Sequence, residues 1–110
     1  MFVFPVPSRA PSGIQLSNVQ FNDVKVQWDP LPRQYINGPL LGYRVYYQED
    51  NFLKAPLGYV DTRNPFANMV TLKGLKTGFR YRIQIAAFTS KGVGPKSYYW
   101  QYITVGGFND

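Results

Sequence analysis

The stretch that decides the fold reads Phe79-Arg80-Tyr81-Arg82-Ile83-Gln84-Ile85-Ala86-Ala87-Phe88. Apolar side chains stand at every second position, and polar ones occupy most of the positions between them. The first set is Tyr81, Ile83, Ile85 and Ala87, and the second is Arg80, Arg82, Gln84 and Ala86. A period of two predicts a β-strand with one face in a core and the other toward solvent.

The same alternation recurs upstream, in residues 24–28 and 41–48. The predicted inward side chains there are Val24, Val26, Trp28, Tyr43, Val45 and Tyr47, and the outward ones on the second strand are Arg44, Tyr46 and Gln48. Weaker strand patterns cover residues 57–61 and 68–73, a final strand covers 97–105, and a first edge strand follows Pro11. Proline and glycine clusters separate these segments, and no helical period appears. The sequence therefore predicts an all-β, seven-stranded antiparallel two-sheet sandwich.

Composition supports one ordered, non-catalytic domain. The 110 residues are 45% hydrophobic and only 16% charged, which is typical of a folded chain with a single core. The sequence holds no cysteine and no histidine, so thiol nucleophiles, imidazole bases and most zinc ligands are missing. We therefore expect no catalytic residue, no metal site and no cofactor.

The ends are predicted to be linkers, at residues 1–10 and 106–110, around a domain at 11–105. Prolines at positions 5, 7 and 11 favour an extended lead-in. The apolar residues 1–5 are too few for a signal peptide or a membrane span, so no membrane insertion is expected. Any targeting signal would lie outside this sequence. The net charge of +6 favours acidic partners, although such a charge also keeps a domain soluble.

Several of these residues together resemble the fibronectin type III domain over about residues 11–105. They are the lone Trp28 closing a strand, Asn37-Gly38-Pro39 before Gly42-Tyr43-Arg44-Val45, Leu75 six residues before Tyr81, and Gly92-Val93-Gly94-Pro95. The chain departs from the family pattern at Thr77 and Phe79, where proline and threonine are usual. The resemblance implies an immunoglobulin-like sandwich with structural roles for Trp28, Tyr43, Leu75 and Tyr81. It also implies that the Tyr81 hydroxyl bonds to backbone near the preceding turn.

The resemblance further implies a non-catalytic protein-interaction or adhesion module of a larger, extracellular multidomain protein. Its partners would be proteins and the adjacent domains of the parent chain, and no nucleic acid partner is expected. Two alternatives stay open. One is a passive spacer domain, including one within a secreted enzyme, and the other is binding of a polyanion such as a sulfated glycan. The chain has no Arg-Gly-Asp tripeptide and no N-glycosylation sequon.

Two sets of residues are candidate binding sites. Outward cations at Arg44, Arg80 and Arg82, with Lys96 nearby, could hold sulfate or phosphate groups, or could instead lie over exposed rings of Tyr46 and Phe88. Period two cannot bury every ring of the final strand, so some of its rings must contact partners or solvent. The predicted protein-binding residues are Tyr46, Phe88, Tyr98, Trp100 and Tyr102, with Lys91 and Val93 in the preceding turn.

Overall fold

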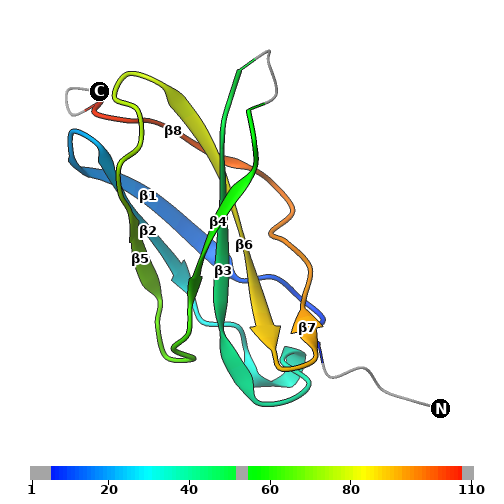
Figure 1. Cartoon of the computed structure of the whole chain (residues 1–110). Helices are drawn as coiled ribbons and strands as arrows, with labels where there is room; N and C mark the ends of the chain where they lie inside the picture. Colours follow the sequence, from blue (N-terminus) through cyan, green and yellow to red (C-terminus); the bar gives the residue numbers. More distant parts are fainter. Residues whose placement is uncertain (1–5, 52–54, 108–110) are drawn as a thin grey trace.

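A computed structural model describes residues 6–51 and 55–107 (Figure 1). The strands are β1 Ser12–Gln20, β2 Asp23–Asp29, β3 Leu40–Glu49, β4 Gly58–Thr62, β5 Met69–Leu72, β6 Arg80–Thr89, β7 Gly92–Val93 and β8 Gln101–Thr104. One 3-10 turn, η1, covers Arg33–Tyr35 in the loop between β2 and β3. All strand pairs are antiparallel. One sheet has the order β1-β2-β5, and the other has the order β4-β3-β6, with both β7 and β8 paired to β6.

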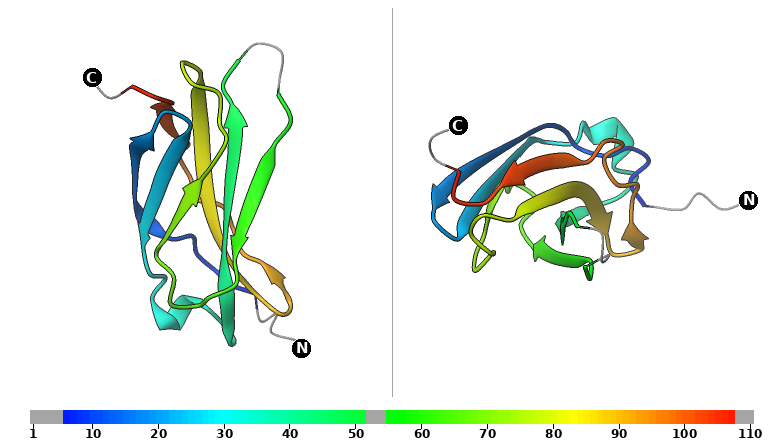
Figure 2. Two further views of the ribbon diagram at one scale, coloured as in Figure 1. Left: turned by 60° about the vertical axis from the view of Figure 1, so that its left-hand side comes forward. Right: turned by 90° about the horizontal axis from the view of Figure 1, so that it is seen from above.

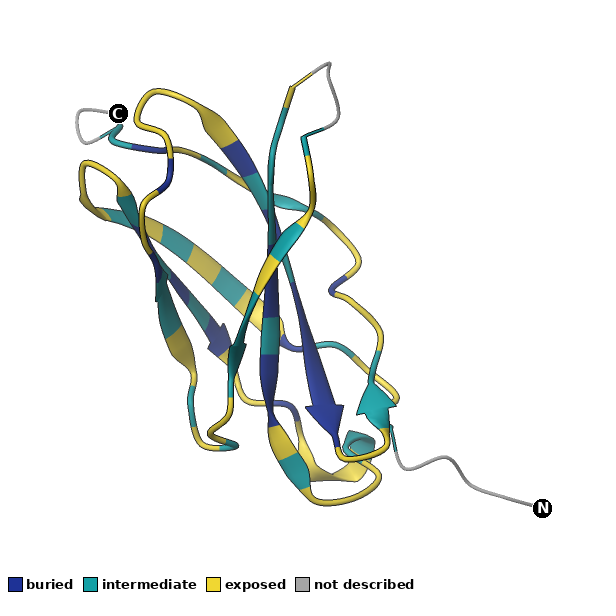
Figure 3. Cartoon of the chain, viewed as in Figure 1, coloured by how far each residue is buried: buried dark blue, intermediate teal, exposed yellow. Residues whose placement is uncertain are grey.

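The predicted fold class is confirmed. The two sheets stack as layers, and their inner faces form a common core (Figure 2). Trp28 is 2% exposed and Tyr81 is 6% exposed, so both of the aromatic residues expected at the centre are buried. Figure 3 shows buried residues along β3 and β6. Trp28 comes from β2 and packs on Tyr43 from β3, with ring centroids 5.2 Å apart. The core therefore joins the two sheets through aromatic contact as well as through aliphatic packing.

Two buried tyrosines end in hydrogen bonds to loops. The Tyr81 hydroxyl accepts a bond from the Lys76 backbone N–H at 3.1 Å, which is the bond that the family resemblance implies. The Tyr43 hydroxyl accepts one from the Leu31 N–H, also at 3.1 Å. Each ring thereby fills apolar space while its polar tip is satisfied.

The final strand is shorter than predicted, and the total is eight strands. A continuous strand over residues 97–105 was expected, but β8 covers only Gln101–Thr104, and the short β7 pairs with β6 beforehand. The cause is local. Pro95 has no backbone N–H for the ladder. Ser97 then makes two hydrogen bonds to Ile85. The Ser97 N–H donates to the Ile85 carbonyl at 2.8 Å, and the Ser97 Oγ accepts from the Ile85 N–H at 3.0 Å. Because the Ser97 hydroxyl occupies that N–H, the chain leaves the ladder until β8.

The N-terminal segment contacts the sandwich from Val6 onward. Asn37 donates to the Val6 carbonyl at 3.1 Å, and the Ser8 N–H donates to the Tyr35 carbonyl at 2.8 Å. Pro7 is fully buried, and a Cβ on Gly94 would stand 2.7 Å from the Pro7 carbonyl oxygen, so only glycine allows this approach. Residues 1–5 and 108–110 of the predicted linkers lie outside the described residues.

Candidate functional site

The candidate cations lie on the outer face of the larger sheet, the face that points away from the core. The register places Arg44 opposite Ala86, and Gln48 opposite Arg82. With side chains alternating between faces, Arg44 on β3 and both Arg80 and Arg82 on β6 share this outer face. The partners of each cation decide what the face can bind.

Arg44 is held by a carboxylate. Its Nε and Nη2 donate to the two oxygens of Asp61 on β4, at 2.7 and 3.0 Å. Its guanidinium also lies 4.1 Å from the centroid of the Tyr59 ring. The bidentate bond to Asp61 raises the pKa of Arg44 above its ordinary value. The positive charge of Arg44 is thus matched within the sheet, and its donors face a protein acceptor.

Arg82 has neutral neighbours. Its Nε and Nη2 both donate to the side-chain oxygen of Gln48, at 3.0 and 2.6 Å, and its guanidinium lies 4.5 Å from the Trp100 ring centroid. Gln48 is fixed in turn by a 2.6 Å bond from its Nε2 to the Ala55 carbonyl. The Gln48 amide and the Trp100 ring therefore hold the guanidinium of Arg82 in place, and neither group neutralises its charge.

Arg80 and Lys96 complete the predicted set. Arg80 lies 3.2 Å from an Asp50 oxygen and 4.3 Å from the Tyr102 ring centroid. Lys96 places its ammonium 4.3 Å from the centroid of Tyr46. The structure thus brings the four predicted cations onto one cation–aromatic surface, but Asp61 and Asp50 neutralise two of them. Arg82 and Lys96 are the cations of this set that lie against neutral groups.

The expectation that Tyr46 and Phe88 are exposed is wrong. Tyr46 is 8% exposed and Phe88 is 6% exposed. Lys96 covers the Tyr46 ring, and the guanidinium groups of Arg44 and Arg63 each lie 6.0 Å from the Phe88 ring centroid. Long cationic side chains shield apolar surface with their stems. These two predicted protein-binding rings therefore form a layer beneath the cations, and a partner on this face would meet the cations first.

The rings of the aromatic segment, which we define as Tyr98, Tyr99 and Trp100, are differently placed. Tyr98 is 85% exposed and Tyr99 is 73% exposed, and their rings make an edge-to-face pair with centroids 4.6 Å apart. Trp100 is half-buried under Arg82, and Tyr102 is exposed beside Arg80. The exposed pair borders a hollow of about 180 Å³ whose other wall is residues 11–14.

The turn residues predicted to bind protein lie apart from the aromatic segment. Lys91 is exposed, its N–H donates to the Thr89 hydroxyl at 3.2 Å, and Val93 is half-buried opposite Phe88. Both line a shallow hollow of about 350 Å³ together with Arg44 and Arg63.

The predicted site residues do not include Asp61, which binds Arg44, or Tyr99, which pairs with Tyr98. Asp61 could have been found only by registering β4 against β3, because that register sets it opposite Arg44. Tyr99 was visible as an aromatic residue, but it faces solvent only because the chain leaves the ladder after Ser97.

The family model described as "Fibronectin type III domain" matches residues 9–101. The chain belongs to the fibronectin type III family. This fibronectin type III domain is 47% identical over 92 residues to MAM and fibronectin type III domain-containing protein 1 of Acropora millepora, covering 84% of the chain and 22% of that relative. It is 33% identical over 92 residues to the netrin receptor DCC of Mus musculus, covering 84% of the chain and 6% of that receptor.

Solved structures agree with this assignment. The third fibronectin III domain of the human KIAA0343 protein matches with a TM-score of 0.84 and 25% identity, over 94% of this chain and 86% of that one. The chain spans about a fifth or less of the length of the curated relatives just described. In the part of the fibronectin type III domain that the structure describes, no helix is long and apolar enough to cross a membrane. Within those same residues, no three or more acidic, cysteine or histidine side chains gather as a metal site.

Proposed function

We propose that this fibronectin type III domain is a protein-interaction module of a larger, extracellular adhesion or receptor protein, and that the aromatic segment is its contact surface. The observation that carries the proposal is the exposure of Tyr98 and Tyr99, at 85% and 73%, as a paired aromatic projection. The names of relatives support the setting, since they include a netrin receptor and the cell adhesion molecule DSCAM of Gallus gallus.

Local structure prepares the aromatic segment for binding. Two hydrogen bonds fix Ser97 to Ile85 at its start, and the stacking of Arg82 on Trp100 holds its end. Tyrosine rings on a rigid support offer large contact area with little loss of side-chain entropy. Contacts of this kind commonly dominate the binding energy of protein interfaces.

A cell-attachment assay tests the proposal. Cells are allowed to attach to surfaces coated with the wild-type domain, with Tyr98→Ala/Tyr99→Ala, or with Phe66→Ala. Phe66 is the matched control, because it is 91% exposed but lies in the loop between β4 and β5. We expect the double variant to need about tenfold more coating protein for equal attachment, as removal of a binding hot spot would require. Equal attachment by wild type and double variant would contradict the aromatic segment as the contact surface.

The spacer function makes the opposite prediction for the wild type. A domain that only sets distance between neighbours supports no attachment at any coating density. That result, obtained with folded protein, would replace the interaction proposal with the spacer.

Polyanion binding is a second candidate because Arg82 and Lys96 lie against neutral groups on the outer face. A heparin column run with a salt gradient tests it. Arg82→Ala/Lys96→Ala should elute at lower salt than Lys25→Ala/Lys73→Ala, which removes the same charge from the smaller sheet and its following turn. Equal elution of the two double variants would mean that only net charge is sensed.

A further inference from the structure

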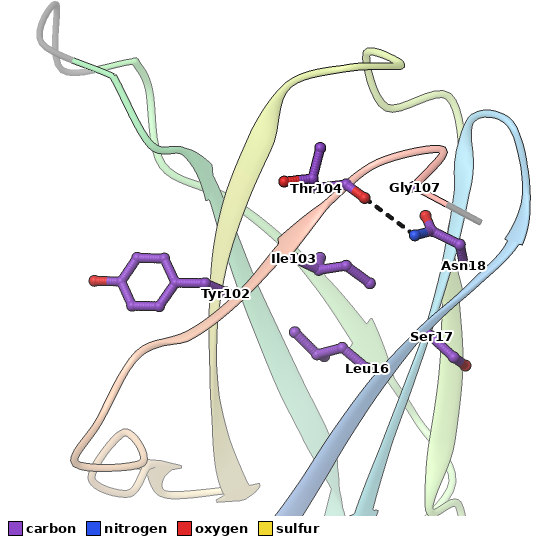
Figure 4. A pocket seen from close by; sticks show the side chains of 7 residues that line it. All are labelled: Leu16, Ser17, Asn18, Tyr102, Ile103, Thr104 and Gly107. Atoms are coloured by element: carbon purple, nitrogen blue, oxygen red, sulfur yellow. Dashed lines mark hydrogen bonds between the residues drawn. The ribbon is translucent and has the colours of Figure 1, made fainter. Parts of the chain in front are cut away.

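Two strand edges face each other across an open groove (Figure 4). Among the described strands, β1 pairs only with β2 and β8 pairs only with β6, so each has one long side without a ladder partner. The groove between them has a volume of about 470 Å³. It is lined by Leu16, Ser17, Asn18, Tyr102, Ile103, Thr104 and Gly107. Edge strands of this kind accept an added strand when nothing blocks them.

The hydrogen bonds show which backbone groups of β8 point into the groove. The Val105 N–H donates to the Phe79 carbonyl at 3.0 Å, so Val105 faces β6. Backbone groups of successive strand residues point to opposite sides, and Thr104 therefore faces away from β6. Its carbonyl indeed accepts a bond from the side chain of Asn18 on β1. By the same alternation, the N–H and carbonyl of Tyr102 also face the groove.

Asn18 already places an amide group on this edge. Its Nδ2 donates to the Thr104 carbonyl at 3.0 Å, and its Oδ1 accepts from the Gly106 N–H at 2.8 Å. A peptide group of an added strand would make this same pair of bonds, one donated and one accepted. The edge therefore binds an amide at its Thr104 end, and the next outward-facing residue, Tyr102, offers the same pair of groups.

The groove floor and its charge indicate the kind of segment that fits. Leu16 and Ile103 are half-buried and pack on the core between the two strands, which suits an apolar side chain from above (Figure 4). The lining residues include no acidic one, and Arg82, which is opposite Tyr102 in register, lies against a neutral amide and a neutral ring. The chain carries a net charge of +6. An incoming strand with acidic side chains would therefore be attracted.

We infer that an extended, acidic peptide segment of a partner protein adds to the free edge of β8, pairing with the backbone of Tyr102. An apolar side chain of the segment lies over Leu16 and Ile103, and its carboxylates face Arg82. This inference goes beyond the proposed function, because it names a second surface that does not use the aromatic segment.

Amide hydrogen exchange on the full chain, followed by NMR, tests the inference directly. The probe is a synthetic peptide of about seven residues that alternates valine with glutamate, a length typical of strands. The matched control alternates valine with lysine. In the free domain the Tyr102 amide should exchange fast and the Ile103 amide slowly. The acidic peptide should slow exchange at Tyr102 by about tenfold or more, as one added backbone hydrogen bond allows, and the basic peptide should not. No slowing, or equal slowing by both peptides, overturns the inference.

A pair of variants separates backbone pairing from side-chain contact. Tyr102→Pro removes the groove-facing N–H and leaves the β6–β8 bonds of Ile103 intact, a position where an edge strand tolerates proline. Tyr102→Ala removes the ring but keeps the N–H. We expect the proline variant to bind the acidic peptide about tenfold more weakly than the alanine variant, and equal affinities would overturn the pairing. If the proline variant does not fold, the exchange measurement on wild type still decides. A further result against the inference is slowing of Tyr102 exchange with rising protein concentration alone, because the occupant would then be a second copy of this chain.

Discussion

The inner and outer tyrosines of this domain show how one residue type serves two purposes. Tyr43 and Tyr81 are buried, and each hydroxyl accepts a backbone hydrogen bond from a loop. Tyr98 and Tyr99 project into solvent and contact each other. The first pair joins loops to the core, whereas the second pair leaves most of its apolar surface uncovered. The difference separates tyrosines that stabilise the fold from tyrosines whose rings are available to a partner, and the predictions test that separation.

The largest effect is expected at the centre of the core. Trp28→Ala removes a side chain that is 2% exposed and packs on Tyr43, so we expect a loss of about 3–5 kcal/mol in the free energy of unfolding. Denaturant titration measures the loss. Trp28→Phe is the control, and it should cost less, because the Trp28 Nε1 has no hydrogen-bond partner among the described residues. A loss below about 1 kcal/mol for the alanine variant would place the stability of this domain elsewhere.

The next effect is expected on the outer face, at the Arg44–Asp61 pair. Arg44→Met leaves Asp61, whose side chain is 13% exposed, without its bidentate partner, and we expect a loss of about 1.5–3 kcal/mol. Adding Asp61→Leu should recover part of that loss, since the uncompensated carboxylate is then removed. Thermal unfolding of the two single variants and the double variant gives the coupling. Additive losses would show that the pair does not stabilise the sheet.

A smaller loss of stability is expected on removing the hydroxyl of either buried tyrosine, and the loss should differ between the two. Tyr43→Phe leaves the buried Leu31 N–H without its acceptor, for an expected loss of about 1–3 kcal/mol. Tyr81→Phe frees the Lys76 N–H, which is only partly buried, and water can replace the lost bond. We therefore expect about 0.5–1.5 kcal/mol there. Chemical denaturation of both variants ranks them, and the reverse order would contradict burial as the cause.

The core residues of β2, β3 and β6 could be predicted from the sequence because their pattern is periodic. Alternation in β2, β3 and β6 placed Trp28, Tyr43 and Tyr81 in the core, and a strand has only two faces to choose between. The same logic failed at Tyr46 and Phe88, since it equates an outward position with exposure. The long cationic side chains of Arg44 and Lys96 cover those rings, and this contact cannot be predicted from the alternation of polar and apolar residues.

The exposed tyrosines and the Arg44–Asp61 pair depend on individual side-chain hydrogen bonds, which leave no periodic pattern in the sequence. The Ser97 hydroxyl takes the Ile85 N–H and so ends the ladder ahead of Tyr98 and Tyr99. Asp61 meets Arg44 only through the register of the short strand β4. Both features follow from the register of the paired strands, which the sequence pattern does not give. The candidate site was therefore harder to predict than the fold.

The smallest effect on stability is expected at the aromatic segment, and it matters most for the comparison. Tyr98→Ala and Tyr99→Ala remove rings that are largely in solvent already, so each should change the free energy of unfolding by about 0.5 kcal/mol or less. Thermal unfolding measures this on the same protein that is used for cell attachment. Rings that can be removed without cost to the fold are free to be selected for binding. If either substitution costs more than about 1 kcal/mol, the ring supports the sandwich, and its exposure no longer argues for a partner.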